Sequence, residues 1–379
     1  MSFIMNIRSV AKYESKILVR SWFFRIFTLL AVVFLGFFNF AMMLMEDNFG
    51  LWFAKSVSSN IPYLNLLLLN TGQAVVAVFL SSEFLKRDKK LDTSEVFYVR
   101  PLSNAEYVVG KIWGNLRVFL FLNLLVLAIV LAFNFMASGV TVDLPAYLVY
   151  FFLISIPTLI FIIGLSIFLM LLLKNQALTF ILLLGYIGLT LFYIQDKFYY
   201  LFDYMVYNLP LFKSTIVGFS NLELILNHRA IYFFAGLGFI FFTIFLFKRL
   251  PNARRSHYPW LFLSFCMFLL MVTAGFRHVR SILWEGEMRA LYTSINNKYV
   301  YEPKMGIDYY DISVEQKSET IRSVVGMEGT ALAASEVFIF CLNPGLRVEE
   351  VKDGEKSLNF KREEQILAVD FGRKIEKGD

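Results

Sequence analysis

Seven long apolar stretches occupy most of the first 276 residues and constrain the fold more than any other feature. A helix needs roughly 20 mostly apolar residues to cross the ~30 Å hydrocarbon core of a bilayer, and each stretch meets or approaches that length. The sequence therefore predicts a mainly α-helical, polytopic membrane protein. The expected spans are Ile26 to Met45, Pro62 to Ser81, Val118 to Ala137, Ala146 to Leu173, Ala177 to Ile194, Ala230 to Phe247 and Trp260 to Phe276.

Charge divides the chain into two regions. Residues 1–280 contain 23 Lys and Arg against 12 Asp and Glu, whereas residues 281–379 contain 13 against 18. The basic excess of the first region gathers in short segments between apolar stretches, which is how membrane topology is encoded and not how nucleic acid is bound. We therefore expect a lipid bilayer as a partner and no nucleic acid.

The same loop charges orient the predicted bundle. With the N-terminus in the cytoplasm, the inner segments hold at least sixteen Lys and Arg, whereas the short outer loops hold four. This bias follows the positive-inside rule, and an odd number of spans then places the C-terminal tail outside the cytoplasm. The four outer basic residues are Lys55, Lys197, Lys213 and Arg229.

The predicted spans contain no Asp, Glu, Lys, Arg or His. Because ionisable groups in the bilayer usually mark ion paths and proton relays, their absence argues against an ion-coupled transporter. The polar residues within the spans are neutral, and we expect most of them to form hydrogen bonds between helices. Asn70, Thr71 and Gln73 lie together near the middle of the second span. Their grouping fits a transport pathway or a dimer seam as well as it fits structural bonding.

Four basic residues recur at every fourth position before the first span. On a helix they form a cationic stripe beside an apolar side, which predicts a helix lying on the inner membrane surface, against anionic lipid. Contact with a partner subunit is an additional hypothesis. The four residues are Arg8, Lys12, Lys16 and Arg20.

The segment 82–114 is rich in polar residues and lies between two apolar spans. Ser103 can cap a helix that begins near Asn104, and Glu106 completes a capping box. The layout of the segment resembles the cytoplasmic loop of type 2 ABC-transporter permeases, with an acidic residue, a basic residue, a leucine, a proline-serine turn, a tyrosine and Gly-Lys in that order. The matching residues are Glu83, Arg87, Leu91, Arg100-Pro101-Leu102-Ser103, Tyr107 and Gly110-Lys111.

This resemblance covers roughly residues 5–250 and implies a six-helix permease domain over residues 1–250. It implies an inner-membrane subunit of a bacterial ATP-driven exporter. Such a subunit dimerises with a second copy or a homologue, and its coupling loop, to which we also assign Lys90, contacts a separate cytoplasmic ATP-binding subunit. The chain has no GxxxxGK[ST] motif, so the ATPase must be another polypeptide. We expect no enzymatic activity and no cofactor in this chain.

The segment from Phe198 to Leu226 is too apolar for a free loop, yet Asn208-Leu209-Pro210 interrupts it. It resembles the half-inserted outer hairpin of the same permease family. An interfacial belt of aromatic residues fits the segment equally well.

The seventh span, within residues 251–280, and the tail, residues 281–379, depart from the six-span pattern. We expect a helix over Leu283 to Asn296 and then a β-rich extracytoplasmic module, in which Asp353-Gly354 is a hairpin turn. The predicted strands are Tyr310 to Val314, Val337 to Leu342, Leu346 to Val351, Leu358 to Phe360 and Ile366 to Phe371.

The run from Ala333 to Asp379 resembles the opening strands of the N-terminal sheet domain of M1-like zinc metallo-aminopeptidases, which some bacterial permeases carry as a fusion. This implies either a truncated or split fusion protein, which we favour, or a small periplasmic module. His228, His257 and His278 are far apart in the sequence and none forms HExxH, so we expect no metal site. The alternative function is a non-transporting anchor for an outer module.

Overall fold

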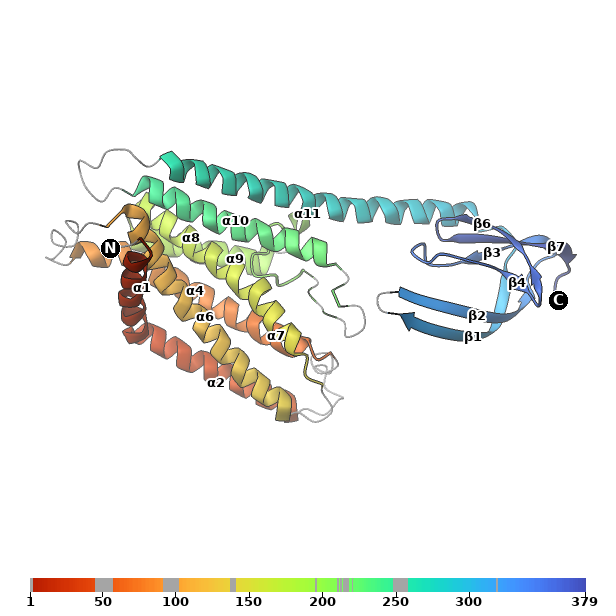
Figure 1. The fold of residues 1–379 in the computed structure, drawn as a ribbon, viewed down its shortest axis with the longest axis horizontal. Coiled ribbons are helices and arrows are strands. Elements are labelled where there is room, and N and C mark those ends of the chain that lie inside the picture. Colours follow the sequence, from red (N-terminus) through yellow and green to blue (C-terminus); the bar gives the residue numbers. More distant parts are fainter. Residues whose placement is uncertain are drawn as a thin grey trace. The chain divides into compact units, whose positions relative to one another are not determined.

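The computed structural model describes residues 3–44, 57–90, 102–136, 141–194, 196–209, 211, 213, 218–219, 221–247, 258–317 and 320–379, with side chains along α4 described as far as Ser81. Two compact units divide the chain, Met1–Ser281 and Ile282–Asp379. The first unit is a bundle of helices and the second contains the strands (Figure 1).

Seven helical stretches of the described residues are long and apolar enough to cross a membrane, as the sequence predicts. They lie alongside one another in the first unit (Figure 1). The shorter helices α1 (Phe3–Arg20) and η3 (Phe198–Tyr200) do not count among them. The seven are α2 (Trp22–Leu44), α4 (Asn60–Lys90), α6 (Asn104–Met136), the run of α7 (Leu144–Tyr150), η1 (Phe151–Ser155) and α8 (Ile156–Leu173), α9 (Gln176–Leu189) with η2 (Thr190–Ile194), α10 (Leu222–Leu246) and α11 (Tyr258–Lys298).

Helix α8 lies in the interior of the bundle, where Leu159, Ile162 and Ile163 are fully buried. Two glycines let its backbone touch that of α10. A Cβ on Gly164 would lie 2.6 Å from the carbonyl oxygen of Gly236, and a Cβ on Gly236 would lie 2.6 Å from the carbonyl oxygen of Ile160. Small residues permit such close approach of helices in lipid, where apolar burial alone does not drive association.

Helix α1 packs one side against α6 and leaves its basic residues exposed. Ala11 and Leu18, from its apolar side, are buried, and α6 is the main helix that α1 contacts. Gly110 and Gly114 of α6 permit this approach, because a Cβ at either position would lie 2.7 Å from an α1 side chain. The apolar side therefore faces protein, and the exposed stripe on the rest of α1 consists of Arg8, Lys12, Lys16 and Arg20.

The peripheral helices α2, α9 and α11 carry large apolar side chains on their outer sides. Phe37 of α2 is 70% exposed, Phe192 of η2, which continues α9, is 87% exposed and Phe276 of α11 is 72% exposed. A soluble monomer rarely exposes contiguous apolar surface on this scale, whereas the hydrocarbon core of a bilayer accommodates it. These outer sides are compatible with contact with lipid.

The segment between η2 and α10 is the one that resembles the half-inserted outer hairpin of the permease family. Its described residues 196–209 form only η3 and a series of turns. Phe198, Tyr199, Phe202 and Tyr207 expose their rings. A half-inserted hairpin and an interfacial aromatic belt therefore both stay predictions for this segment.

The second unit contains a long two-stranded ribbon, a three-stranded sheet and a short hairpin. All the pairs are antiparallel, and Gly354, at φ +60°, forms the predicted turn between β4 and β5. The sheet order is β3-β7-β6. The strands are β1 (Met305–Lys317), β2 (Thr320–Ala331), β3 (Ser335–Cys341), β4 (Lys352–Asp353), β5 (Lys356–Ser357), β6 (Asn359–Glu363) and β7 (Ile366–Ile375).

The tail differs from the prediction in three respects. Residues 346–351 form no strand, because Val348 and Val351 instead pack on a small core around Leu358. Strand β2 was not predicted, and the helix over 283–296 is the continuation of α11. The unit has only small clusters of buried side chains, such as Ile295 with Ile339 and Ile366.

We expect Gly164→Ala to destabilise the bundle, because the new methyl group would overlap the backbone of α10. Overpacking of this kind costs about 1–3 kcal/mol, so the thermal unfolding midpoint of the purified protein should fall. Gly185→Ala on α9 is the matched control, since nothing lies within 4 Å of its Cβ position. Equal midpoints for the two variants would contradict the close α8–α10 contact.

Candidate functional site

Three clusters of buried polar groups in the bundle are considered as candidate sites: one where α1 meets α6, one in the middle of the bundle, and one where α10 and α11 contact the segment 198–209. At the first, the predicted capping box is present. The Ser103 amide donates to Glu106 Oε2 at 2.6 Å, and the Glu106 amide donates to Ser103 Oγ at 3.1 Å. Asn6 of α1 donates to the other oxygen of Glu106 at 2.8 Å. The start of α6 is therefore fixed to α1.

A buried ion pair joins the same two helices. Lys111 Nζ lies 3.0 Å from Glu14 Oε2, and both side chains are only 3% exposed. Arg117 adds a donor to the carbonyl oxygen of Ala11 at 2.8 Å, and Ser15 donates to the carbonyl oxygen of Gly114 at 2.7 Å. Since breaking a buried pair leaves one charge uncompensated, α1 and α6 should move together.

The end of α10 reaches this junction. The ring of Tyr107 stacks on Phe247, with centroids 5.4 Å apart and an interplanar angle of 10°. Asn104 of α6 donates to the carbonyl oxygen of Phe247 at 2.6 Å. The junction of α1, α6 and the end of α10 thus lies directly after the segment 82–101.

The residues predicted to form a coupling loop fall into three groups. Glu83, Arg87 and Lys90 lie on the last turns of α4, which continues as a helix past the predicted span. Leu91 and Pro101 lie outside the described residues. Tyr107 and Lys111 are buried in the α1–α6 junction. Tyr107 and Lys111 therefore belong to the interior of the bundle and do not form an exposed docking surface.

The middle cluster joins α4, α6 and η1 through four fully buried side chains. Gln73 donates to Asn70 Oδ1 at 2.6 Å, and Asn123 donates to Gln73 Oε1 at 2.9 Å. Ser155 donates to Asn123 Oδ1 at 2.8 Å. Two of the amides also donate to backbone, that of Asn70 to the carbonyl oxygen of Leu66 at 2.7 Å and that of Asn123 to the carbonyl oxygen of Phe119 at 2.8 Å. We call these four residues the amide cluster.

The amide cluster accounts for two of the three residues predicted as a pathway or dimer seam. Asn70 and Gln73 face the interior of their own chain. Thr71 is half-buried and donates to the carbonyl oxygen of Leu67 in its own helix. The geometry of Asn70 and Gln73 is that of interhelical bonding, and of the three only Thr71 also reaches the surface.

The π-helical turn η1 connects the amide cluster with the third cluster. A π turn interrupts the regular ladder of backbone bonds, and the carbonyl oxygen of Leu153 accepts from Arg229 Nε at 2.7 Å. The same guanidinium donates to the Tyr204 carbonyl at 2.9 Å and to Thr158 Oγ1 at 2.9 Å. Arg229 is 2% exposed, so the basic residue predicted for an outer loop is an interior residue of α10.

Asp203 is the acidic residue of the third cluster and is also 2% exposed. Its carboxylate accepts three backbone N–H groups, from Tyr207 and Asn208 at 2.8 Å and from Leu209 at 3.3 Å. Burial raises the pKa of Asp203 above its ordinary value, while these bonds and the charge of Arg229 act in the opposite direction.

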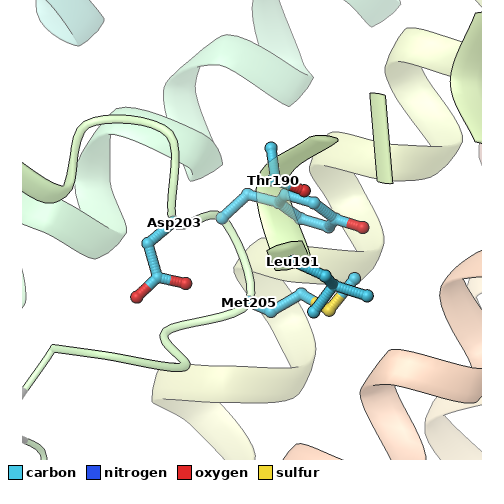
Figure 2. A pocket seen from close by; sticks show the side chains of 5 residues that line it. Thr190, Leu191, Asp203 and Met205 are labelled. Atoms are coloured by element: carbon cyan, nitrogen blue, oxygen red, sulfur yellow. The ribbon is translucent and has the colours of Figure 1, made fainter. Parts of the chain in front are cut away.

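A small pocket lies beside this carboxylate. In Figure 2 the Asp203 carboxylate points away from Leu191 and Met205, which line the other side. The pocket has no room for a water molecule, whereas sites that enclose a drug-sized ligand have volumes of roughly 300–1,000 Å³. The pocket therefore does not enclose a large substrate in this conformation.

Two histidines that are fifty residues apart meet in the third cluster. The rings of His228 on α10 and His278 on α11 have centroids 5.0 Å apart, and both residues are fully buried. Among the described residues, no three His, Cys, Asp or Glu side chains gather as a metal site would require.

Comparison of the sequence with models of known families and with curated proteins found no match. The residues that sequence reasoning missed are the buried charges. Glu14 and Arg229 carry no local sequence signal of burial. The neighbour of a buried charge is set by tertiary packing, as the contacts of Lys111 and Arg229 illustrate.

We expect Lys111→Met to lower the stability of the protein by about 3–5 kcal/mol, because it removes the ammonium group that lies 3.0 Å from the buried Glu14 carboxylate. The double variant Glu14→Met with Lys111→Met should recover most of that loss, since no charge then stays buried. Chemical denaturation of the purified variants measures both. A double variant no more stable than Lys111→Met would contradict the buried pair.

A second prediction concerns the amide cluster. Asn123→Leu removes the partner of both Gln73 and Ser155, and interhelical hydrogen bonds in membranes contribute about 0.6–2 kcal/mol each. We therefore expect a lower unfolding midpoint for Asn123→Leu, and a smaller effect for Thr71→Val, whose bond lies within one helix. A larger effect of Thr71→Val would indicate that this position belongs to an intermolecular seam.

Proposed function

We propose that the chain is the permease subunit of an ATP-driven exporter in a bacterial inner membrane, working as a dimer with separate cytoplasmic ATP-binding subunits. The loop motif from Glu83 to Lys111 and the seven apolar helices support this proposal. The chain would supply the membrane passage, and its partner would supply the hydrolysis of ATP.

The α1–α6 junction is the observation that carries the proposal. A motor that acts on a membrane bundle needs a stiff connection between its docking loop and the helices. The segment 82–101 leads directly into Ser103 and Glu106, which hold the start of α6 to Asn6. The Glu14–Lys111 pair fixes the next turns of α6. Movement of the loop would thus be passed to α1 and α6 as one body.

The distribution of buried charge fits an exporter of neutral or amphipathic cargo. The amide cluster in the middle of the bundle contains amides and a hydroxyl group. The buried ions Lys111 and Arg229 lie away from this cluster, near the N-terminal ends of α6 and α10 respectively. An ion-coupled carrier would need ionisable groups on its path, and the amide cluster contains none, which supports ATP as the energy source.

A non-transporting anchor is the second candidate. Two observations favour it: the amide cluster is closely bonded, and the second unit is a separate compact body that the seventh span would tether. Purification of the chain as a monomer, without an ATPase, from cells that express the neighbouring genes would support this candidate over the permease.

We expect the double charge reversal Arg87→Glu with Lys90→Glu to abolish the ATP hydrolysis that the permease stimulates in its partner, because both residues precede the junction on the docking side. Hydrolysis by the complex co-purified in nanodiscs is the measurement. Lys356→Glu, in the second unit, is the control and should leave hydrolysis unchanged. Full stimulation in the double variant would refute the assigned coupling loop.

A further inference from the structure

The segment 198–209 is held to the bundle by its own backbone carbonyls. Four of them accept hydrogen bonds from side chains of α10 and α11. Tyr232 donates to the carbonyl oxygen of Leu201 at 2.5 Å, and Arg229 donates to that of Tyr204 at 2.9 Å. The other two acceptors are the carbonyls of Tyr200 and Tyr199, which lie 3.0 Å and 2.9 Å from Nε2 of His228 and His278 respectively.

The backbone of this segment is strained, so the side-chain contacts have to hold it in place. Phe198, Tyr199 and Tyr200 have φ values of 51°, 59° and 62°, in the left-handed region. Non-glycine residues in that region cost about 1–3 kcal/mol each and persist only where the surroundings fix them. Removal of the donors would therefore allow the segment to relax away from the bundle.

The two histidines differ in how they tolerate a proton. Nδ1 of His278 lies 3.4 Å from the carbonyl oxygen of Leu224, so both nitrogens of that ring face an acceptor. Nδ1 of His228 is buried and has no hydrogen-bond partner among the described residues. A proton on His278 can therefore be accommodated. A proton on His228 would be a buried donor without an acceptor.

Other charges around the pair make a second proton still less favourable. Arg229 follows His228 on α10, and Arg277 precedes His278 on α11, where it is paired with Glu223 of α10 at 3.1 Å. From the segment itself, Asp203 is the acidic group, and its carboxylate is bonded to backbone N–H groups. Two imidazolium ions beside Arg229 would place three cations in a buried cluster with one buried carboxylate.

We propose that His228 and His278 form an acid-sensitive latch that holds segment 198–209 on α10 and α11 at neutral pH and releases it on acidification. The latch is defined by contacts within this chain, so it stands independently of the permease assignment. If the chain is oriented with this end outside the cytoplasm, the latch would respond to the external pH.

Hydrogen–deuterium exchange of the full chain in nanodiscs tests the latch. The readout is the protection of amides 199–209 at pH values between 8 and 5. The intrinsic exchange rate at each pH is corrected with an unstructured reference peptide. We expect protection to fall by about tenfold or more, the change that one unit of pKa difference between seated and released states produces. The double variant His228→Gln with His278→Gln should keep the segment protected at both values, because glutamine donates a hydrogen bond without titrating.

Two controls separate the histidines from other groups. His257→Gln replaces the only other histidine of the chain and should leave the pH response intact, as should Asp203→Asn, although burial raises the pKa of that carboxyl. The proposal is overturned if protection in the unmodified protein does not change with pH, if the response survives in the double glutamine variant, or if Asp203→Asn alone abolishes it. If the double glutamine variant is unprotected at both pH values, the latch needs imidazole specifically. The two histidine titrations, resolved by NMR, must then occur over the same pH range as the release of the segment, and the proposal fails if they do not.

Discussion

A polar group buried between the helices of the first unit has no access to bulk water, so its hydrogen bonds have to come from the chain itself. The π turn η1 is where this constraint acts most visibly. Its wider turn presents the Leu153 carbonyl to Arg229 and the Ser155 hydroxyl to Asn123. One local irregularity therefore serves two clusters, and the arrangement of α4, α6, α8 and α10 depends on it.

The strength of the buried interactions differs between the ends and the middle of the bundle. The ends contain buried ions, such as the pair of Glu14 and Lys111, and breaking a buried ion pair is costly. The middle contains neutral amides, whose bonds are weaker and more easily exchanged. A bundle built in this way has stiff ends and a more adaptable centre. That distribution suits a protein whose helices are moved from one end, which is the mechanical requirement of the proposed permease.

The spans could be predicted because length and apolarity decide them, and the capping box because its residues are close in sequence. The predicted interior lacked ions because the charged residues near span ends were assigned to loops. Arg229 shows why: its burial depends on a carbonyl of η1, seventy-six residues away. The pairing of His228 with His278 likewise depends on α10 packing against α11, which no local pattern encodes. Strand β2 was missed because Gly326 and Gly329 interrupt its pattern.

Thr158 and Ser155 lie on the same helical run, one turn apart, and they belong to different clusters. Thr158 accepts from Arg229 and donates to the Tyr204 carbonyl, whereas Ser155 bonds to the amide cluster. If segment 198–209 leaves the bundle, Thr158 loses the carbonyl oxygen to which it donates, and Arg229 loses one of its three hydrogen-bond acceptors. The guanidinium would then need a new acceptor, and the backbone to which it is still bonded is that of η1, through the Leu153 carbonyl oxygen. Release of the segment would therefore disturb the helix that positions Ser155, so the third cluster and the amide cluster cannot rearrange independently.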